Sequence, residues 1–433
     1  MKRLPLGGRG VGVREHGRIR GRLLVAPPRM LRFRLPVLQS PPRARAATSC
    51  VLLIAAWLAV SGSGLATTPA AAPAAAGAGA HDDGARGELT AVARLLAGMD
   101  PVGGSAPLHA VTQTEAWRAH RKASQYGDRQ LRTRLQRMDQ WQHTVLPTPA
   151  GPEAALIYPF SGPDFVNAFA LFPNYRTYVF FSLEPPGDVP ALAQMDEHQR
   201  GELFSDLRGA LNDLVALNFF ITPNMKEELH TDSLQGTVPV LLAQMGLLDL
   251  RVVSVEPFEP FERRTTSDKP RANKPALPLR AVRIEFEDRA GGAHTLLYLS
   301  MDVSDGQLSF YPEFIPWLRS FQQPAVLLKS ASYLLHGGNF RKVRGVIRDR
   351  ARLIVQDDTG MPYHLLRDNG FQIALYGQYE RPVKLFENRY QKDLDAAFES
   401  TGNPEPVPFP FGYNWRKEGR SGVIVARRPS SDT

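Results

Sequence analysis

The sequence has a single cysteine, Cys50, among 433 residues. It lies at the entrance of an apolar run near the N-terminus, so the chain beyond that run contains no cysteine. A disulfide framework and a thiol nucleophile are therefore excluded for the folded part of the chain. Its stability has to come from an ordinary apolar core.

Long apolar runs and several well-known motifs are also missing. The apolar run Val51–Val60 has ten residues, whereas a transmembrane helix needs roughly 18 or more. The histidines are scattered without an H-E-x-x-H pattern, and no segment matches the phosphate-binding loop G-x-x-x-x-G-K-[ST]. These absences argue against a zinc site and against a P-loop nucleotide site.

Acidic residues are nearly absent from residues 1–49, which carry twelve Lys or Arg and one acid, Glu15. The net charge of +9 therefore arises in this leader, and the remaining chain carries a charge of −2. A basic segment, a short apolar run and a small-residue exit are typical of a secretory signal. We expect residues 1–66 to be a signal peptide, with Met1 or Met30 as the start, and the protein to be periplasmic or secreted. Nucleic acid is not expected as a partner, and no stable membrane span remains if the signal is cleaved.

The rest of the chain divides by composition and periodicity. Residues 67–87 contain mainly Ala, Pro and Gly, which predicts a disordered linker. Residues 88–148 predict a helical extension. Residues 149–425 predict one α/β domain, with an exposed, basic, proline-containing insertion at 260–279.

The helical extension contains one long amphipathic segment. Thr112 and Glu115 have capping-box spacing ahead of a helix that reaches about Trp141. Seven basic side chains between Arg118 and Arg137 are typical of a solvated helix face, with an anionic partner as the alternative.

Strand and helix patterns alternate through the α/β domain. The segments with strand patterns are 155–160, 177–185, 251–255, 281–286, 295–303, the start of 325–336, 353–358 and 371–379. The segments with helical patterns are a brief one before 177, then 196–220, 234–248 and about 340–351. The two runs that flank Gly291 and Gly292 predict a hairpin. The alternation predicts a mostly parallel sheet flanked by helices.

This order resembles the Rossmann-like core of class I methyltransferases over about residues 153–380. A strand with a polar turn is followed by a strand that ends in Glu184, twenty-two residues after Gly162, and later by a strand ending in Asp and a closing pair of strands. The resemblance implies that Gly162 and Glu184 occupy cofactor-binding positions. The glycine-rich turn is reduced to Ser161-Gly162-Pro163-Asp164, in which Pro163 has no N–H to donate, so no cofactor is expected. The phrases YPFSGPDF, KSASYLLH and QDDTGMPY also resemble uncharacterised exported bacterial proteins, a resemblance that implies no activity.

Polar side chains follow several of the expected strands. The carboxyl ends of parallel strands meet at one edge of a sheet, where open α/β folds bind ligands. The candidate catalytic residues at that edge are Ser161, Asp164, Lys329, Ser332, Asp357 and Asp358. Each residue also has an ordinary use in a turn or a helix cap.

Three kinds of chemistry are conceivable at these residues. Asp358-Thr359-Gly360 spells the tripeptide of aspartic proteases, although a turn explains it more simply. Ser332 would pair with Lys329, or with His336 on one helix face, in a serine nucleophile system, but no G-x-S-x-G elbow surrounds it. The aromatic residues near strand ends would offer stacking surface to a ligand or fill the core.

Two classes of function follow from these patterns. The first is an exported envelope protein that binds an unknown small molecule or envelope ligand, or has a structural role, on a degenerate methyltransferase-like scaffold. The alternative is an enzyme, either a hydrolase or a residual S-adenosylmethionine-dependent methyltransferase, that uses the polar cleft at the strand ends.

Overall fold

The computed structural model describes residues 83–149, 151, 153–217, 231–261, 279–413 and 421–429. The expected signal peptide, residues 67–82 of the linker and most of the 260–279 insertion lie outside the described residues. Residues 83–87, which the composition assigned to the disordered linker, instead form the start of a helix that continues to Leu96, so the helical extension begins before residue 88. No helix of the described part combines the length and the apolar character that a membrane span needs.

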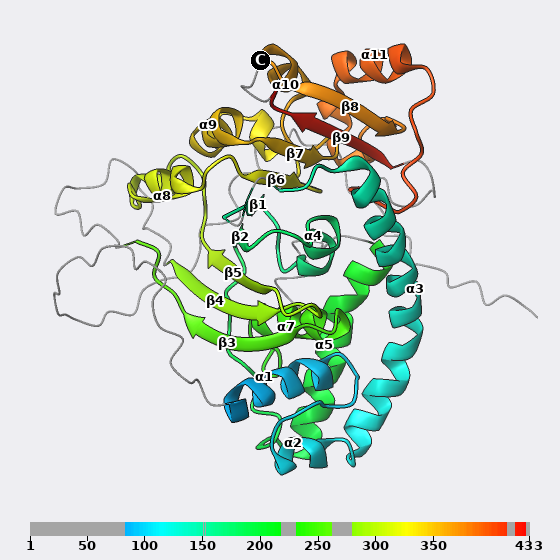
Figure 1. The fold of residues 1–433 in the computed structure, drawn as a ribbon, viewed down its shortest axis with the longest axis vertical. Coiled ribbons are helices and arrows are strands. Elements are labelled where there is room, and N and C mark those ends of the chain that lie inside the picture. Colours follow the sequence, from blue (N-terminus) through cyan, green and yellow to red (C-terminus); the bar gives the residue numbers. More distant parts are fainter. Residues whose placement is uncertain are drawn as a thin grey trace, which may run out of the picture. The chain divides into compact units, whose positions relative to one another are not determined.

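One sheet of nine strands forms the centre of the fold (Figure 1). The strands are β1 (Ala155–Pro159), β2 (Thr177–Ser182), β3 (Arg251–Pro257), β4 (Arg280–Glu287), β5 (Ala293–Ser300), β6 (Ala325–Leu328), β7 (Leu353–Gln356), β8 (Gln372–Gly377) and β9 (Gly422–Arg427). Their order across the sheet is β3-β4-β5-β2-β1-β6-β7-β9-β8. Every strand pattern found in the sequence corresponds to a strand, and β9 is an additional one.

The sheet is mixed rather than mostly parallel. The central pairs β5/β2, β2/β1, β1/β6 and β6/β7 are parallel. The pairs toward the two edges, β3/β4, β4/β5, β7/β9 and β8/β9, are antiparallel and contain more paired residues. The α/β prediction is therefore confirmed. The prediction of a mostly parallel sheet is wrong, because antiparallel strands extend the sheet at both edges.

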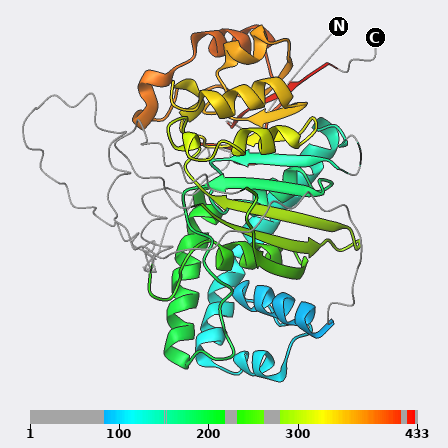
Figure 2. The ribbon, with the colours of Figure 1, turned by 90° about the vertical axis from the view of Figure 1, so that its left-hand side faces the viewer.

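Helices accompany the sheet throughout the described chain (Figure 2). The α-helices are α1 (Asp83–Leu96), α2 (Ala106–Val111), α3 (Glu115–Val145), α4 (Phe165–Leu171), α5 (Glu197–Leu217), α7 (Val238–Leu247), α8 (Phe314–Ser320), α9 (Arg341–Arg350), α10 (Tyr363–Asp368) and α11 (Lys392–Thr401). Short 3₁₀ turns are η1 (Gln307–Ser309), η2 (Leu334–His336) and η3 (Lys384–Arg389).

Both faces of the central strands are buried, because successive side chains of a strand point to opposite faces. Tyr158 and Phe180 belong to a cluster with α1, α3, α4, α5 and α7. Ile157 and Val179 belong to a second cluster with α8, α9, α10 and α11. The sheet thus lies between two layers of helices, which explains the nearly continuous apolar sequence of β1 and β2.

The hairpin expected around Gly291 and Gly292 joins β4 to β5. Asp288 holds the turn, since its Oδ1 accepts hydrogen bonds from the N–H groups of Ala290 and Gly292, each at 2.8 Å. Gly291 adopts φ +82°, a conformation that glycine reaches without strain. The hairpin prediction is confirmed.

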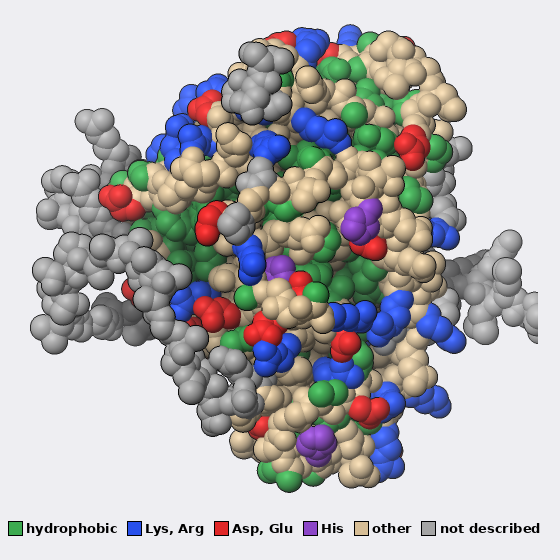
Figure 3. Space-filling view, viewed as in Figure 1, with side chains coloured by type: hydrophobic (Ala, Val, Ile, Leu, Met, Phe, Trp, Pro, Cys, Tyr) green, Lys and Arg blue, Asp and Glu red, His purple; other side chains and the backbone are tan. Residues whose placement is uncertain are grey.

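Helix α3 is the long helix of the N-terminal extension. Lys and Arg side chains gather on the surface along its lower part (Figure 3). Arg118, Lys122 and Arg129 of this helix are exposed, as a solvated face requires. Arg134 differs, because it is buried and only 7% exposed.

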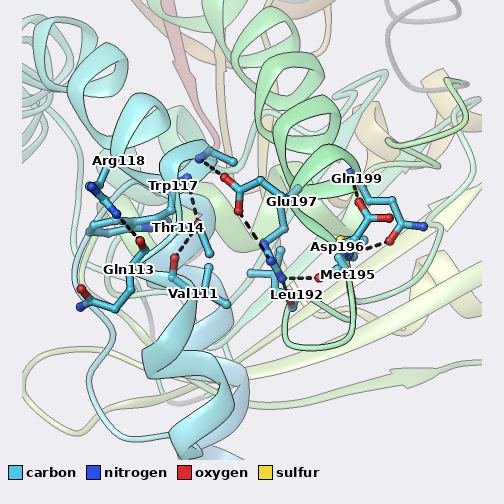
Figure 4. Close-up of polar contacts among 12 residues, drawn as sticks. Val111, Gln113, Thr114, Trp117, Arg118, Leu192, Met195, Asp196, Glu197 and Gln199 are labelled. Carbon is cyan, nitrogen blue, oxygen red and sulfur yellow. Dashed lines mark hydrogen bonds and ion pairs between the residues drawn. The ribbon is translucent and has the colours of Figure 1, made fainter.

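The N-termini of α3 and α5 are capped and bonded to each other (Figure 4). The cap of α3 is Thr114, whose Oγ1 accepts from the N–H of Trp117 at 3.3 Å, so the capping box predicted from Thr112 is wrong. Asp196 and Gln199 form a reciprocal capping box at α5, with bonds of 2.8 and 2.9 Å. Glu197 accepts from the N–H of Ala116 at 2.6 Å and so joins the two helices.

Candidate functional site

The candidate residues lie where three neighbouring strands end. Strands β1, β6 and β7 are adjacent and parallel, so the segments that follow them occupy the same edge of the sheet. These segments are 160–164, 329–333 and 357–359. Their contacts place Asp164 against Lys329, the 330–333 backbone against Asp357, and Tyr333 against Asp358.

Lys329 and Asp164 form an ion pair at the junction of β6 and β1. Lys329 Nζ lies 2.7 Å from Asp164 Oδ2, and the two side chains are 1% and 2% exposed. Asp164 also accepts from the Tyr158 hydroxyl at 2.8 Å and from Asn167 Nδ2 at 2.7 Å. Burial lowers the pKa of Lys329, and Asp164 opposes that change by stabilising the ammonium.

Arg134 brings a second buried cation to this pair from helix α3. Burial lowers its pKa to about 10, and the charge of Asp164 acts in the opposite direction. The positive charge of Arg134 also contributes to lowering the pKa of Lys329. The sequence carried one signal for this role: Arg134 follows Leu131 by three residues and precedes Met138 by four, on the apolar side of the helix.

Asp357 holds two strand-end segments together. Its Oδ2 accepts from the N–H of Ser330 at 3.0 Å, and its Oδ1 accepts from the N–H of Thr359 at 3.0 Å and the Thr359 hydroxyl at 2.5 Å. Thr359 in turn accepts from the N–H groups of Ala331 at 2.7 Å and Tyr333 at 3.1 Å. Burial raises the pKa of Asp357, while these hydrogen bonds and Lys329 oppose the rise. Both oxygens of the Asp357 carboxylate accept hydrogen bonds from the strand-end segments. The role of Asp357 is therefore to hold these segments in position.

The contacts of Asp358 differ from those of Asp357. Its Oδ2 accepts a hydrogen bond from the Tyr333 hydroxyl, and its backbone carbonyl accepts from Gln391 Nε2 at 2.8 Å. Burial, and then the neighbouring charge of Asp357, raise the pKa of Asp358 to about 7. A carboxyl group with such a pKa exchanges its proton near neutral pH. Asp358 and Asp357 also line a small pocket together with residues of β9 and α11 and of the segments that follow β8 and precede β9.

Backbone strain is concentrated in the same segments. Ser330, Ser332 and Tyr333 have φ values of +55°, +52° and +55°, and Phe160 directly after β1 has +59°. Side-chain-bearing residues rarely adopt this left-handed conformation, which costs of order 1–3 kcal/mol per residue and clusters at functional sites. The contacts of Asp357 and Thr359 hold the 330–333 segment in it.

The serine candidates lack the partners of a nucleophile. Ser332 Oγ lies 2.7 Å from the Tyr413 hydroxyl. Its segment is not a helix shared with His336, because only the short turn η2 forms there. The hydroxyl of Ser161 is buried without a hydrogen bond to any described residue. Neither serine is bonded to Lys329, His336 or an acid in the described part of the chain.

The methyltransferase resemblance assigned Gly162 and Glu184 to a cofactor site. The two residues belong to separate sets of contacts. Gly162 has φ +54° in the turn after β1. Glu184, beyond β2, accepts a hydrogen bond from Ser182 Oγ, and its carbonyl accepts from the Tyr298 hydroxyl at 3.0 Å. These contacts tie Glu184 to β2 and β5, and none joins it to the Asp164–Lys329 pair.

Comparisons with protein-family models, with curated proteins and with solved structures gave no match for this chain. Among the described residues, no group of three His, Cys, Asp or Glu side chains is arranged to hold a metal ion. Function therefore has to be argued from the residues themselves.

Proposed function

We propose that this chain is an exported ligand-binding protein built on a methyltransferase-like scaffold that has lost its nucleotide site. The layout supports the scaffold. The parallel strands, numbered along the chain, have the spatial order third, second, first, fourth, fifth, which is the order of doubly wound nucleotide-binding folds. Strands β9 and β8 then supply the closing pair.

The observation that carries the proposal is the buried ion pair between Lys329 and Asp164. In such folds the ligand crevice forms where the strand order reverses, here between β1 and β6. That position is occupied by the two charged side chains, which are nearly excluded from solvent. Asp164 is engaged by three donors, and Pro163 has no N–H for a phosphate or carboxylate. A cofactor would have to displace this pair.

The test is a calorimetric titration of the purified full-length protein with S-adenosylmethionine. We expect no measurable heat of binding at a cofactor concentration of about 1 mM, because separating a buried ion pair costs several kcal/mol. A dissociation constant in the micromolar range corresponds to about −8 kcal/mol. Binding of that strength would contradict the proposal and favour a methyltransferase.

A hydrolase is the second candidate, and one observation favours it. Asp358, with its pKa of about 7, has the proton affinity of a general acid or base. Against it, the nearby Ser332 hydroxyl is bonded to Tyr413, and the oxygens of Asp357 are taken by Ser330 and Thr359. The aspartic-protease interpretation of Asp358-Thr359-Gly360 fits these contacts poorly, because Thr359 and Asp357 serve to brace the turn.

A further inference from the structure

Helix α3 carries a basic face that the candidate site does not use. Residues 116–138 contain seven Lys or Arg and one acid, Asp128. Three of the seven are engaged with other parts of the fold: Arg121, Arg134 and Arg137. The other four are exposed, and together we call them the basic stripe: Arg118, Lys122, Arg129 and Arg132. Figure 3 shows Lys and Arg side chains gathered along this helix.

The basic stripe is straight and lies on a convex surface. Because a helix has 3.6 residues per turn, the four residues lie within an arc of about 80° and extend over about 21 Å of its length. Gln125 and Gln136 are exposed in the same arc, and their side chains carry no charge. A convex row of cations does not enclose a small anion, so it suits an extended anionic surface.

The other strongly basic helix, α9, is different. It has five Lys or Arg and one acid, Asp349. Each of the five donates to a carboxylate, an amide or a backbone carbonyl of the chain; they are Arg341, Lys342, Arg344, Arg348 and Arg350. Within the part of the chain that the structure describes, no acid pairs with a member of the basic stripe. The charge of the stripe is therefore available to a partner outside the chain.

We propose that the basic stripe docks this protein on an anionic phospholipid surface. Each Lys or Arg held near such a surface adds to the affinity by electrostatic attraction, and a row of them needs no pocket. The chain beyond residue 49 has a charge of −2. The attraction therefore depends on the local arrangement of the stripe and not on net charge, since exposed charges act over about 10 Å at 0.1 M salt.

The place where folding begins favours a bilayer over a soluble polyanion. Residues 61–82 separate helix α1 from the apolar run Val51–Val60, which the sequence predicts to engage a membrane during export. Helix α1 also lies against the half of α3 that carries Arg118 and Lys122, because the carbonyl oxygen of Leu96 is 2.9 Å from His120 Nε2. The stripe thus adjoins the element that follows the membrane-directed segment.

The experiment measures co-sedimentation of the full-length protein with phospholipid vesicles in about 0.1 M NaCl. Vesicles of equal parts phosphatidylglycerol and phosphatidylcholine provide an anionic surface, and vesicles of phosphatidylcholine alone provide a neutral one. We expect the protein to bind the anionic vesicles at least about tenfold more tightly. Raising the salt to about 0.5 M should remove most of this difference, because salt screens exposed charges.

Two fourfold variants separate the stripe from the basic leader, which every form of the protein shares. The stripe variant combines Arg118→Gln, Lys122→Gln, Arg129→Gln and Arg132→Gln. It should bind the anionic vesicles about 100-fold or more weakly than the parent protein. The matched control removes the same charge from α8 and α9, on the opposite face of the sheet, by Arg319→Gln, Arg341→Gln, Lys342→Gln and Arg348→Gln. It should bind within about threefold of the parent, since its stripe is intact.

Circular dichroism checks that each variant folds. If the stripe variant does not, Arg129→Gln with Arg132→Gln should weaken binding about tenfold. Equal binding of the parent to both kinds of vesicle, unchanged binding of a folded stripe variant, or an equal loss in the matched control would overturn the proposal. Binding to double-stranded DNA that depends on the stripe, without such binding to vesicles, would also overturn it and make the stripe a polyanion site. The S-adenosylmethionine titration judges the proposed function separately, because it does not involve the surface of α3.

Discussion

The Lys329–Asp164 ion pair has both charges inside the protein, where an unpaired charge is costly. Removing one partner of such a pair typically destabilises a protein by about 3–5 kcal/mol, because the other charge is left buried. We therefore expect Lys329→Met to lower the free energy of unfolding by about that amount. Denaturant unfolding measures the change.

Two further variants make this prediction specific. Lys392→Met, at an exposed position at the start of α11, should change the free energy of unfolding by less than about 0.5 kcal/mol. Adding Asp164→Asn to Lys329→Met should recover part of the loss, because the neutral amide needs no counter-ion. A cost below about 1 kcal/mol for Lys329→Met would show that Arg134 or solvent already balances Asp164.

At the scale of the elements, His120 joins three helices. From α3, its Nε2 lies 2.9 Å from the carbonyl oxygen of Leu96 in α1, and its Nδ1 lies 3.1 Å from Arg208 Nη1 in α5. Its ring stacks on Phe204 with centroids 4.4 Å apart. Nε2 therefore donates and Nδ1 accepts, which requires the neutral ring. Burial lowers the pKa of His120 to about 4.

This geometry predicts a stability that depends on pH. Between pH 6.5 and about 4 the unfolded chain binds a proton at His120 and the folded protein does not, so stability falls as the pH falls, by up to about 1.4 kcal/mol per unit. His120→Gln should be less stable at pH 7, by about 1–3 kcal/mol, but should lose less stability on acidification. Unfolding curves at pH 7, 5.5 and 4.5 measure both effects. His143→Gln, at an exposed histidine of the same helix, is the control, and parallel pH curves for His120→Gln and the parent would disprove the role.

The elements that sequence patterns predicted are those whose signal is local. Apolar runs such as Ala155–Pro159 and the turn at Asp288 specify a strand and a hairpin by themselves. The pairing of β3 with β4 spans the 260–279 insertion and depends on long-range contacts. Strand β9 was not predicted, since its six residues follow an aromatic and proline-rich tail that suggested terminal packing.

For the candidate site, the sequence predicted which residues come together but not the contacts that each of them makes. Parallel strands end at one edge, so the convergence of Asp164, Lys329 and Asp357 follows from strand order alone. Three things required the tertiary structure: the approach of Arg134 to Asp164 and Lys329, the separate contacts of Glu184, and the different surroundings of Asp357 and Asp358. Adjacent residues in a sequence give no indication that one is saturated with hydrogen bonds and the other lines a pocket.

At the scale of the whole molecule, the N-terminal helices belong to the same core as the sheet. Helix α1 packs against α7 and β3, and Ala91, Leu95 and Leu96 on it are fully buried. Any processing of the chain has to leave these residues in place, since removing them would expose the apolar surface that they cover.

This requirement agrees with cleavage of a signal ahead of Ala91. We expect the mature protein from its native host to begin between about Thr67 and Gly87, because a basic leader followed by a short apolar run, Val51–Val60, is typical of a signal that directs export and is then removed. N-terminal sequencing of the envelope fraction measures the start. A variant with Leu52→Arg and Leu53→Arg should stay in the cytoplasm with its leader intact, because two charges interrupt the apolar run. Soluble cytoplasmic protein that retains Arg43 in the parent strain would contradict export, and with it the proposal of an envelope ligand.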